Sequence, residues 1–181
     1  DVEIIQLPDK VGAYSHSVSG LDMRKDTGTW TGYNYFNNCK FNYCAYGIDI
    51  DTSLASVCYF NNCTISSNGY FGAKLIGVGC GGMNNCDIAG NGKLGEILGE
   101  FDETKYGGVY VKGSNFTIEK CWHEYNHNKY SMIGATNDIY IHPDSINVTE
   151  ISPRYLRTKV GSYTTTQSQG QQERNYFTDV P

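Results

Sequence analysis

One pattern of apolar and polar positions recurs along the middle of the chain. An apolar residue is followed by two polar residues, a cysteine, a polar residue and an apolar residue, and the last three positions alternate as in a strand. Three copies cover residues 36–41, 60–65 and 83–88, and a looser fourth covers residues 118–123. Their cysteines are 24, 23 and 35 residues apart, at positions 39, 63, 86 and 121. A nearly constant spacing indicates one structural unit repeated along an axis.

The repeated unit contains strands and turns rather than helices. Short β-type runs follow the copies at residues 46–50, 71–76 and 108–111, and Gly or Asn bounds each of them. These runs are too short for helices, and the spacing of a leucine-rich repeat is missing. A coil of about 23 residues built from strands and turns predicts an all-β chain, folded as a single-stranded parallel β-helix.

Stacked coils bring equivalent residues of the repeat into ladders about 4.8 Å apart. We expect the repeat cysteines to be buried, reduced and free of disulfides, which suits assembly in a reducing cytoplasm. We also expect apolar ladders inside the stack, and ladders of Asn amides that hydrogen-bond along a turn. The predicted ladders are Cys39, Cys63, Cys86 and Cys121; Phe36, Phe60, Met83 and Ile118; Phe41, Ile65 and Ile88, interrupted by His123; Asn37, Asn61 and Asn84; and Asn38, Asn62 and Asn85.

The 35-residue spacing indicates an insertion of about a dozen residues, because insertions in solenoids become surface loops. We place this loop at residues 93–106. Residues 1–27 are expected to form one or two leading coils or an entry segment, residues 28–145 the coils with the insertion, and residues 146–181 a less regular segment. The ends show no obvious cap, which predicts a fragment of a larger chain or an oligomer.

Charge narrows the range of partners. The chain has 14 Lys and Arg against 19 Asp and Glu, a formal net charge of −5, which argues against nucleic acid as a partner because phosphates require a basic surface. No apolar stretch approaches the roughly 20 residues that span a bilayer, so we expect no membrane insertion. A neutral or weakly charged glycan suits this balance, and we expect no cofactor.

The coil motifs resemble those of a known group of proteins. The repeated Phe-Asn-Asn-Cys segments and the run Ile-Glu-Lys-Cys-Trp-His-Glu-Tyr-Asn at residues 118–126 resemble right-handed β-helix proteins of the pectate-lyase-like group, most of all bacteriophage tailspikes and related appendages. The resemblance covers residues 28–145. It implies a homotrimer of the phage virion, assembled in the host cytoplasm, that binds a bacterial surface polysaccharide and in many cases cleaves it. The calcium-binding Asp residues and the catalytic Arg or Lys of the lyases cannot be assigned to positions of this sequence.

Hydrolysis of a glycosidic bond requires two carboxyl groups, about 5 Å or about 6.5–9.5 Å apart depending on the mechanism. Residues on adjacent coils can be neighbours, so sequence distance does not exclude a pair. For any single acid, a solvated surface is the alternative interpretation. The candidate catalytic residues are Glu96, Glu100, Asp102 and Glu103 of the insertion and Glu124 of the following coil, with Asp49, Asp51 and Asp87 as further coil acids.

Aromatic side chains close to the insertion are candidates for substrate binding. Tyr and Trp rings combine an apolar face with a polar tip, which suits stacking on sugar rings. Packing between coils is the alternative interpretation. The candidates are Tyr106, Tyr110, Trp122 and Tyr125.

Residues 123–127, His-Glu-Tyr-Asn-His, match the zinc peptidase signature H-E-x-x-H. That chemistry needs a helix that places both histidines on one face. The repeat instead aligns Asn126 with Asn68 and Asn91, each five residues after a repeat cysteine. The repeat therefore predicts the end of a strand and a turn in this segment.

Two classes of function follow from these observations. The first is a depolymerase that cuts a bacterial surface glycan with a pair of carboxylates. The second is a non-catalytic, receptor-binding or structural segment of a phage fibre. Two carboxylates in a groove would favour the first, and isolated acids on a convex surface would favour the second.

Overall fold

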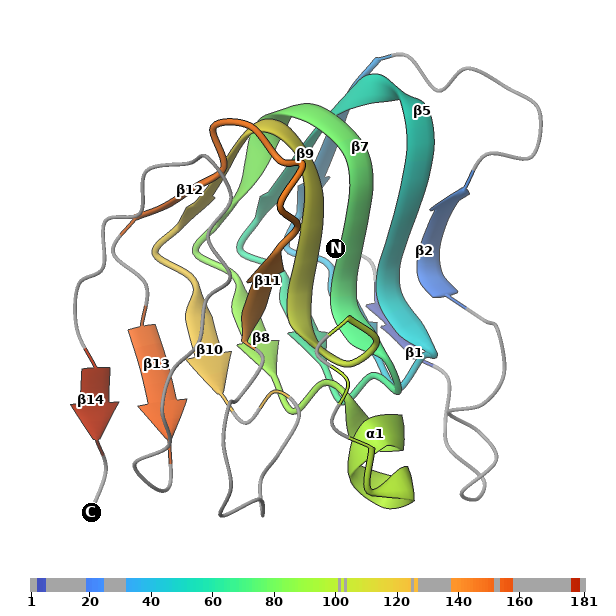
Figure 1. The fold of residues 1–181 in the computed structure, drawn as a ribbon, viewed down its shortest axis with the longest axis vertical. Coiled ribbons are helices and arrows are strands. Elements are labelled where there is room, and N and C mark those ends of the chain that lie inside the picture. Colours follow the sequence, from blue (N-terminus) through green and yellow to red (C-terminus); the bar gives the residue numbers. More distant parts are fainter. Residues whose placement is uncertain are drawn as a thin grey trace.

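The chain winds into successive coils that stack as a parallel β-helix (Figure 1). The computed structural model describes residues 3–5, 19–24, 32–100, 102, 104–124, 126, 138–151, 154–157 and 177–179, with the backbone alone at 3–5, 53–56, 154–157 and 177–179. Every pairing between the described strands is parallel. The all-β fold and the stack of parallel coils predicted from the repeat are therefore confirmed.

Two sheets make three faces. The long strands bend and form two of them: face 1 consists of their first halves with β2 and β11, and face 2 of their second halves with β3 and β12. Face 3 is the sheet of short strands. The long-strand sheet contains β2 (Ser19–Arg24), β3 (Tyr33–Asn37), β5 (Tyr46–Asn61), β7 (Phe71–Asn84), β9 (Gly107–Glu119), β11 (Ile139–Ile141) and β12 (Thr149–Ile151). Face 3 contains β1 (Glu3–Ile5), β4 (Lys40–Asn42), β6 (Thr64–Ser66), β8 (Asp87–Ala89), β10 (Trp122–Glu124), β13 (Arg154–Arg157) and β14 (Phe177–Asp179).

The chain ends also contribute strands to these sheets. Strands β12, β13 and β14 extend the stack beyond residue 146, where the sequence predicted a less regular segment. Strands β1 and β2 precede the first copy of the repeat and pair with β4 and β5. The short strand expected at residues 15–18 lies outside the described residues. Among the described residues, no helix is long and apolar enough to cross a membrane.

The predicted interior ladders are confirmed. Successive coils place the expected residues in register. Each apolar side chain that is fully buried in this way contributes roughly 1.5–3 kcal/mol to the free energy of folding. The rings of Phe36 and Phe60 stack with centroids 5.0 Å apart. All four repeat cysteines are buried and carry free thiols. The register partners are Phe36, Phe60, Met83 and Ile118 in one ladder, and Phe41, Ile65, Ile88 and His123 in the other.

The Asn ladders predicted at the turn between faces 2 and 3 are formed as well. Asn38, Asn62 and Asn85 adopt φ values of 55°, 54° and 53°, a left-handed conformation that Asn tolerates better than most residues. The Asn85 side-chain amide donates a 2.8 Å hydrogen bond to the Asn62 side-chain oxygen. Amide pairing along the axis therefore satisfies polar groups that a sharp bend would otherwise leave unpaired.

A third Asn ladder, which is buried, closes the corner between faces 3 and 1. Asn68 donates to Asn91 at 2.8 Å, Asn91 to Asn126 at 2.8 Å, and Asn126 to Asp138 at 3.0 Å. The alignment of Asn126 with Asn68 and Asn91 is thus confirmed. Gly72 is required beside this ladder, because a Cβ atom there would lie 2.7 Å from the Asn91 amide nitrogen.

The insertion leaves the stack directly after this corner and begins with a short helix, α1 (Lys93–Leu98), where the sequence suggested only a loop. Gly92 and Gly99, both with positive φ, flank the helix. The backbone amides of Lys93 and Leu94 donate to the carbonyls of Asn68 and Gly69 on the preceding coil. Figure 1 shows α1 below the ends of β5 and β7, away from β10.

Candidate functional site

The described acidic residues of the insertion each have a partner close in sequence. The Lys93 ammonium lies 3.1 Å from a carboxylate oxygen of Glu96, one helical turn away. The Tyr106 hydroxyl donates a 2.6 Å hydrogen bond to Glu100. These two predicted catalytic carboxylates are therefore held by local partners.

Asp102 is also neutralised locally. It accepts hydrogen bonds from the Thr104 backbone amide at 2.9 Å and the Thr104 hydroxyl at 2.6 Å, and Lys105 lies 3.5 Å away. The Thr104 hydroxyl bond is the main cause that holds the pKa of Asp102 below its usual value. A carboxyl group with a lowered pKa is a poor proton donor at neutral pH. Glu103 lies outside the described residues.

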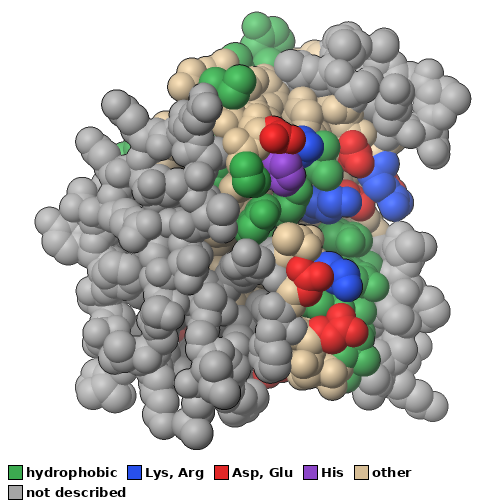
Figure 2. All heavy atoms as spheres, in the orientation of Figure 1, with side chains coloured by type: hydrophobic (Ala, Val, Ile, Leu, Met, Phe, Trp, Pro, Cys, Tyr) green, Lys and Arg blue, Asp and Glu red, His purple; other side chains and the backbone are tan. Residues whose placement is uncertain are grey.

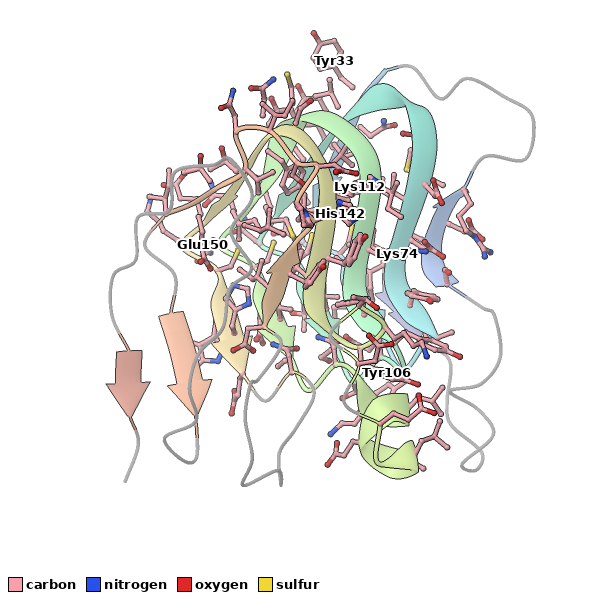
Figure 3. All side chains as sticks on the ribbon, in the orientation of Figure 1. Tyr33, Lys74, Tyr106, Lys112, His142 and Glu150 are labelled. Carbon is pink, nitrogen blue, oxygen red and sulfur yellow. The ribbon has the colours of Figure 1, made fainter. Side chains whose placement is uncertain are left out.

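Tyr106, expected as a platform for sugar, is instead a packing residue. Its side chain is 3% exposed, and its ring stacks on Tyr70 with centroids 5.7 Å apart. Tyr70 in turn stacks on Tyr46 at 4.9 Å. Burial of this corner stack and the bond to Glu100 raise the pKa of Tyr106. Figure 3 shows Tyr106 beside α1, far from the labelled residues Lys112 and His142.

Trp122 and Glu124, two further predicted site residues, lie together on the outer side of face 3. Alternation along β10 turns Cys121 and His123 inward, where both are fully buried. The side chains of Trp122 and Glu124 are half-exposed, and the indole N–H of Trp122 donates a 3.1 Å hydrogen bond to Glu124. The indole thereby fixes the direction of the carboxylate.

Asp87 completes this group from the preceding coil. It is the register partner of Trp122 on β8, and Glu124 lies two residues farther along β10. With a rise of about 3.3 Å per residue and strands about 4.8 Å apart, the Cα atoms of Asp87 and Glu124 are about 8 Å apart. That separation allows carboxyl distances within the range used by glycosidases. We call Asp87, Trp122 and Glu124 the face 3 cluster.

The electrostatics of the face 3 cluster differ from those of the insertion. Partial desolvation, and in second place the negative charge of Glu124, raise the pKa of Asp87 above its ordinary value. The Asp87 side chain nevertheless stays accessible to solvent. An accessible carboxyl group with a raised pKa holds its proton to a higher pH, which is a property that general acids share.

Tyr110, another predicted binding residue, lies on face 1. Its ring stacks on Tyr140 of the next coil with centroids 5.3 Å apart. Lys112 and Asp144 form a 2.9 Å ion pair next to it. Figure 2 shows that acidic and basic side chains alternate on this face, and Figure 3 places Lys74, Lys112 and His142 along it. On face 1, the stacked Tyr110 and Tyr140 rings thus lie beside the Lys112–Asp144 ion pair.

The other coil acids on face 1 divide into a buried and an exposed one. Asp49 is 1% exposed, with Arg24 at 3.5 Å and Lys74 at 3.9 Å. Burial raises its pKa, and the two cations oppose that shift. Asp51 is exposed. Asp49 therefore belongs to the packing of this face rather than to an accessible pair.

The first two residues of the histidine signature, His123 and Glu124, lie in strand β10 and not in a helix. His123 and Glu124 point to opposite sides of β10, so they cannot share a metal-binding helical face. The His123 imidazole lies 3.8 Å from Glu150 inside the stack, and burial lowers its pKa to about 3, so it is neutral. Within the described part of the chain, no three His, Cys, Asp or Glu side chains are grouped so that they could hold a metal ion.

The structure thus groups Trp122 with Glu124, while Tyr110 and the described acids of the insertion lie elsewhere. Tyr125 lies outside the described residues. Asp87 was only one of several coil acids in the sequence, but one signal singles it out. Asp87 and Trp122 each follow a repeat cysteine directly, so the repeat itself predicts that they are neighbours.

Comparison with known protein families agrees with this geometry. A family model described as a right-handed β-helix region matches residues 19–179. The chain belongs to the right-handed β-helix family. The handedness expected from the resemblance is therefore confirmed for this β-helix protein. No curated protein and no solved structure matches the chain significantly.

Proposed function

We propose that this β-helix protein recognises and depolymerises a bacterial surface polysaccharide, as a homotrimeric, tailspike-like component of a phage virion. The observation that supports the proposal is the face 3 cluster. Coil stacking places two carboxyl groups beside an indole ring on an accessible surface. Asp87 and Glu124 take the catalytic roles, in place of the acids of the insertion.

The chemistry follows from the three side chains. The protonated carboxyl group of Asp87 donates its proton to the glycosidic oxygen as the bond from that oxygen to the anomeric carbon breaks. A water molecule attacks the anomeric carbon from the other side, Glu124 accepts the proton that this water loses, and the remaining hydroxyl group becomes that of the new reducing end. Trp122 stacks on a neighbouring sugar ring and holds the carboxylate of Glu124 through its N–H group.

A non-catalytic, receptor-binding segment of a phage fibre is the second candidate. One observation favours it: the described acids of the insertion are held by local partners, and face 1 carries the stacked pair Tyr110 and Tyr140 among ion pairs. Such a surface binds glycan through ring stacking and hydrogen bonds without proton transfer.

The deciding experiment incubates the chain with purified capsule and O-polysaccharides from a panel of bacteria. New reducing ends and calorimetric binding are measured for the parent, Asp87→Asn and Glu124→Gln. The proposal expects cleavage by the parent and binding without cleavage by both variants. Binding without cleavage by the parent supports the receptor-binding alternative, and the absence of both refutes the two candidates. Light scattering at micromolar concentration tests the trimer, and a monomer would contradict it.

A further inference from the structure

Face 2 carries a ladder of aromatic rings on its outer side that ends one ring early. Tyr35 of β3 and Tyr59 of β5 are register partners, and their rings are nearly parallel, at 7°, with centroids 5.1 Å apart. The next register position, on β7, is Gly82, followed by Thr117 on β9. Among the described residues, no ring therefore stacks on the face of the Tyr59 ring that points along the axis toward Gly82.

Close packing of the backbone keeps this ring position empty. A Cβ atom on Gly82 would lie 2.4 Å from the carbonyl oxygen of Thr117, so only glycine fits. The neighbouring residue Gly81 has a φ of 134°, which also favours glycine. A depression of about 430 Å³ results, bounded by Tyr59 on one side and Thr117 on the other. Its size falls in the range of small-molecule sites.

The rim of the depression is polar and nearly neutral. Asn61, Asn84 and Asn115 contribute amides, and the side chain of Asn84 is exposed. Glu119 is the acid that lines the depression, and the Lys120 ammonium lies 2.7 Å from its carboxylate. The rim therefore offers donors and acceptors for hydroxyl groups without an unbalanced charge.

We propose that this depression is a binding subsite for one neutral pyranose ring, stacked on Tyr59 in the place of the missing ring. A pyranose presents a flat C–H face that suits an aromatic ring, and its equatorial hydroxyl groups point outward to the rim. The parallel stacking of Tyr35 on Tyr59 shows the spacing at which a ring sits along this axis. The subsite lies on face 2, around a corner from the face 3 cluster, and does not depend on catalysis there.

The test titrates the full chain, labelled with ¹³C in its tyrosine rings, with the methyl glycosides of glucose, galactose, mannose, rhamnose and N-acetylglucosamine. We expect at least one glycoside to shift the Tyr59 ring resonances, with upfield shifts of its own C–H protons. In the Tyr59 variants the upfield shifts of the glycoside C–H protons are the readout. Tyr59→Ala, which loses the stacked ring, should weaken binding about two- to tenfold and reduce these shifts at equal glycoside concentration. Tyr59→Phe should keep them because an aromatic ring remains.

Matched controls separate the subsite from other effects. Tyr33→Ala removes an exposed tyrosine of β3 that does not line the depression, and it should bind like the parent. Asn84→Ala should weaken binding while the Tyr110 and Tyr140 resonances report an intact fold. Asp87→Asn should leave the titration unchanged, so a failure of the proposed catalysis would not affect this result. Unchanged Tyr59 resonances with all five glycosides would overturn the inference, as would stronger binding of phenol, which would indicate an aromatic protein partner.

Discussion

Two groups of carboxylates in this molecule have opposite electrostatics. Asp102 in the insertion accepts two hydrogen bonds from Thr104, and its pKa is lowered. Asp87 on face 3 is partly desolvated, lies near the negative charge of Glu124, and its pKa is raised. The first group was the stronger candidate for catalysis in the sequence, and the second is the group to which we assign catalysis in the proposed function.

The difference follows from how each group is assembled. Residues in the insertion have partners two to six positions away, where a Lys, Thr or Tyr side chain binds an acid. Residues on stacked coils meet neighbours that are 35 positions away, chosen by register alone. The buried ladders beneath the surface can therefore hold like charges and aromatic rings next to one another. The packing of the interior offsets the repulsion between the charges.

The largest expected effect separates the two groups in a cleavage assay. Asp87→Asn and Glu124→Gln should each reduce the release of reducing ends by about 10²–10⁴-fold, because positioned acid–base groups contribute that much. Glu96→Gln and Asp102→Asn are the matched controls, and they should stay close to the parent. A larger loss of cleavage in the two insertion variants than in the two face 3 variants would assign catalysis to the insertion instead.

A third carboxylate, Glu150, extends the comparison into the interior, where it faces His123. His123→Ile should destabilise the fold by about 1–3 kcal/mol, because it removes the polar neighbour of a buried carboxyl group. The double variant His123→Ile, Glu150→Met continues both apolar ladders and should recover or exceed the parent's stability. Urea unfolding measures both. A double variant no more stable than the single one would show that the pair itself supports the fold.

The same pair predicts an acid-sensitive stability. His123 has a folded-state pKa of about 3, below its unfolded value of about 6.5, so the unfolded state binds a proton first as the pH falls. The contribution of neutral His123 to the free energy of unfolding is fully present above about pH 6.5. As the pH falls from about 6 to about 3, the free energy of unfolding should decrease by up to about 1.4 kcal/mol per pH unit. Chemical denaturation at several pH values tests the slope. The double variant should lack this contribution, and an equal slope in both proteins would contradict the assignment.

The smallest effect concerns binding at the face 3 cluster. Trp122→Ala should weaken glycan binding about two- to tenfold, the contribution of one aromatic contact. Tyr106→Phe, at the buried corner stack, should leave binding unchanged, because that ring does not reach solvent. Calorimetry with a glycan that the parent binds compares the two. A loss for Tyr106→Phe with none for Trp122→Ala would mean that the insertion, and not face 3, contacts the glycan.

The repeat made the interior of the coils predictable, but it did not predict the structure of the insertion. A constant spacing fixes the register, so the ladders through Cys63, Phe60 and Asn62 follow from the sequence alone. Residues 93–106 have no counterpart in other coils, so neither the helix α1 nor the burial of Tyr106 could be predicted. The empty ring position at Gly82 was also missed, because it depends on the close approach of the Thr117 backbone rather than on a motif.

The central claim is that coil stacking couples Asp87 to Glu124. The most direct test is a ¹³C NMR titration of the Asp87 carboxyl group in the parent and in Glu124→Gln, with Asp102 as the internal control. We expect a pKa above the ordinary value for Asp87 in the parent, a lower value in Glu124→Gln, and a lowered, unchanged value for Asp102 in both. An Asp87 pKa at or below its ordinary value, or one that does not respond to Glu124→Gln, would contradict the account.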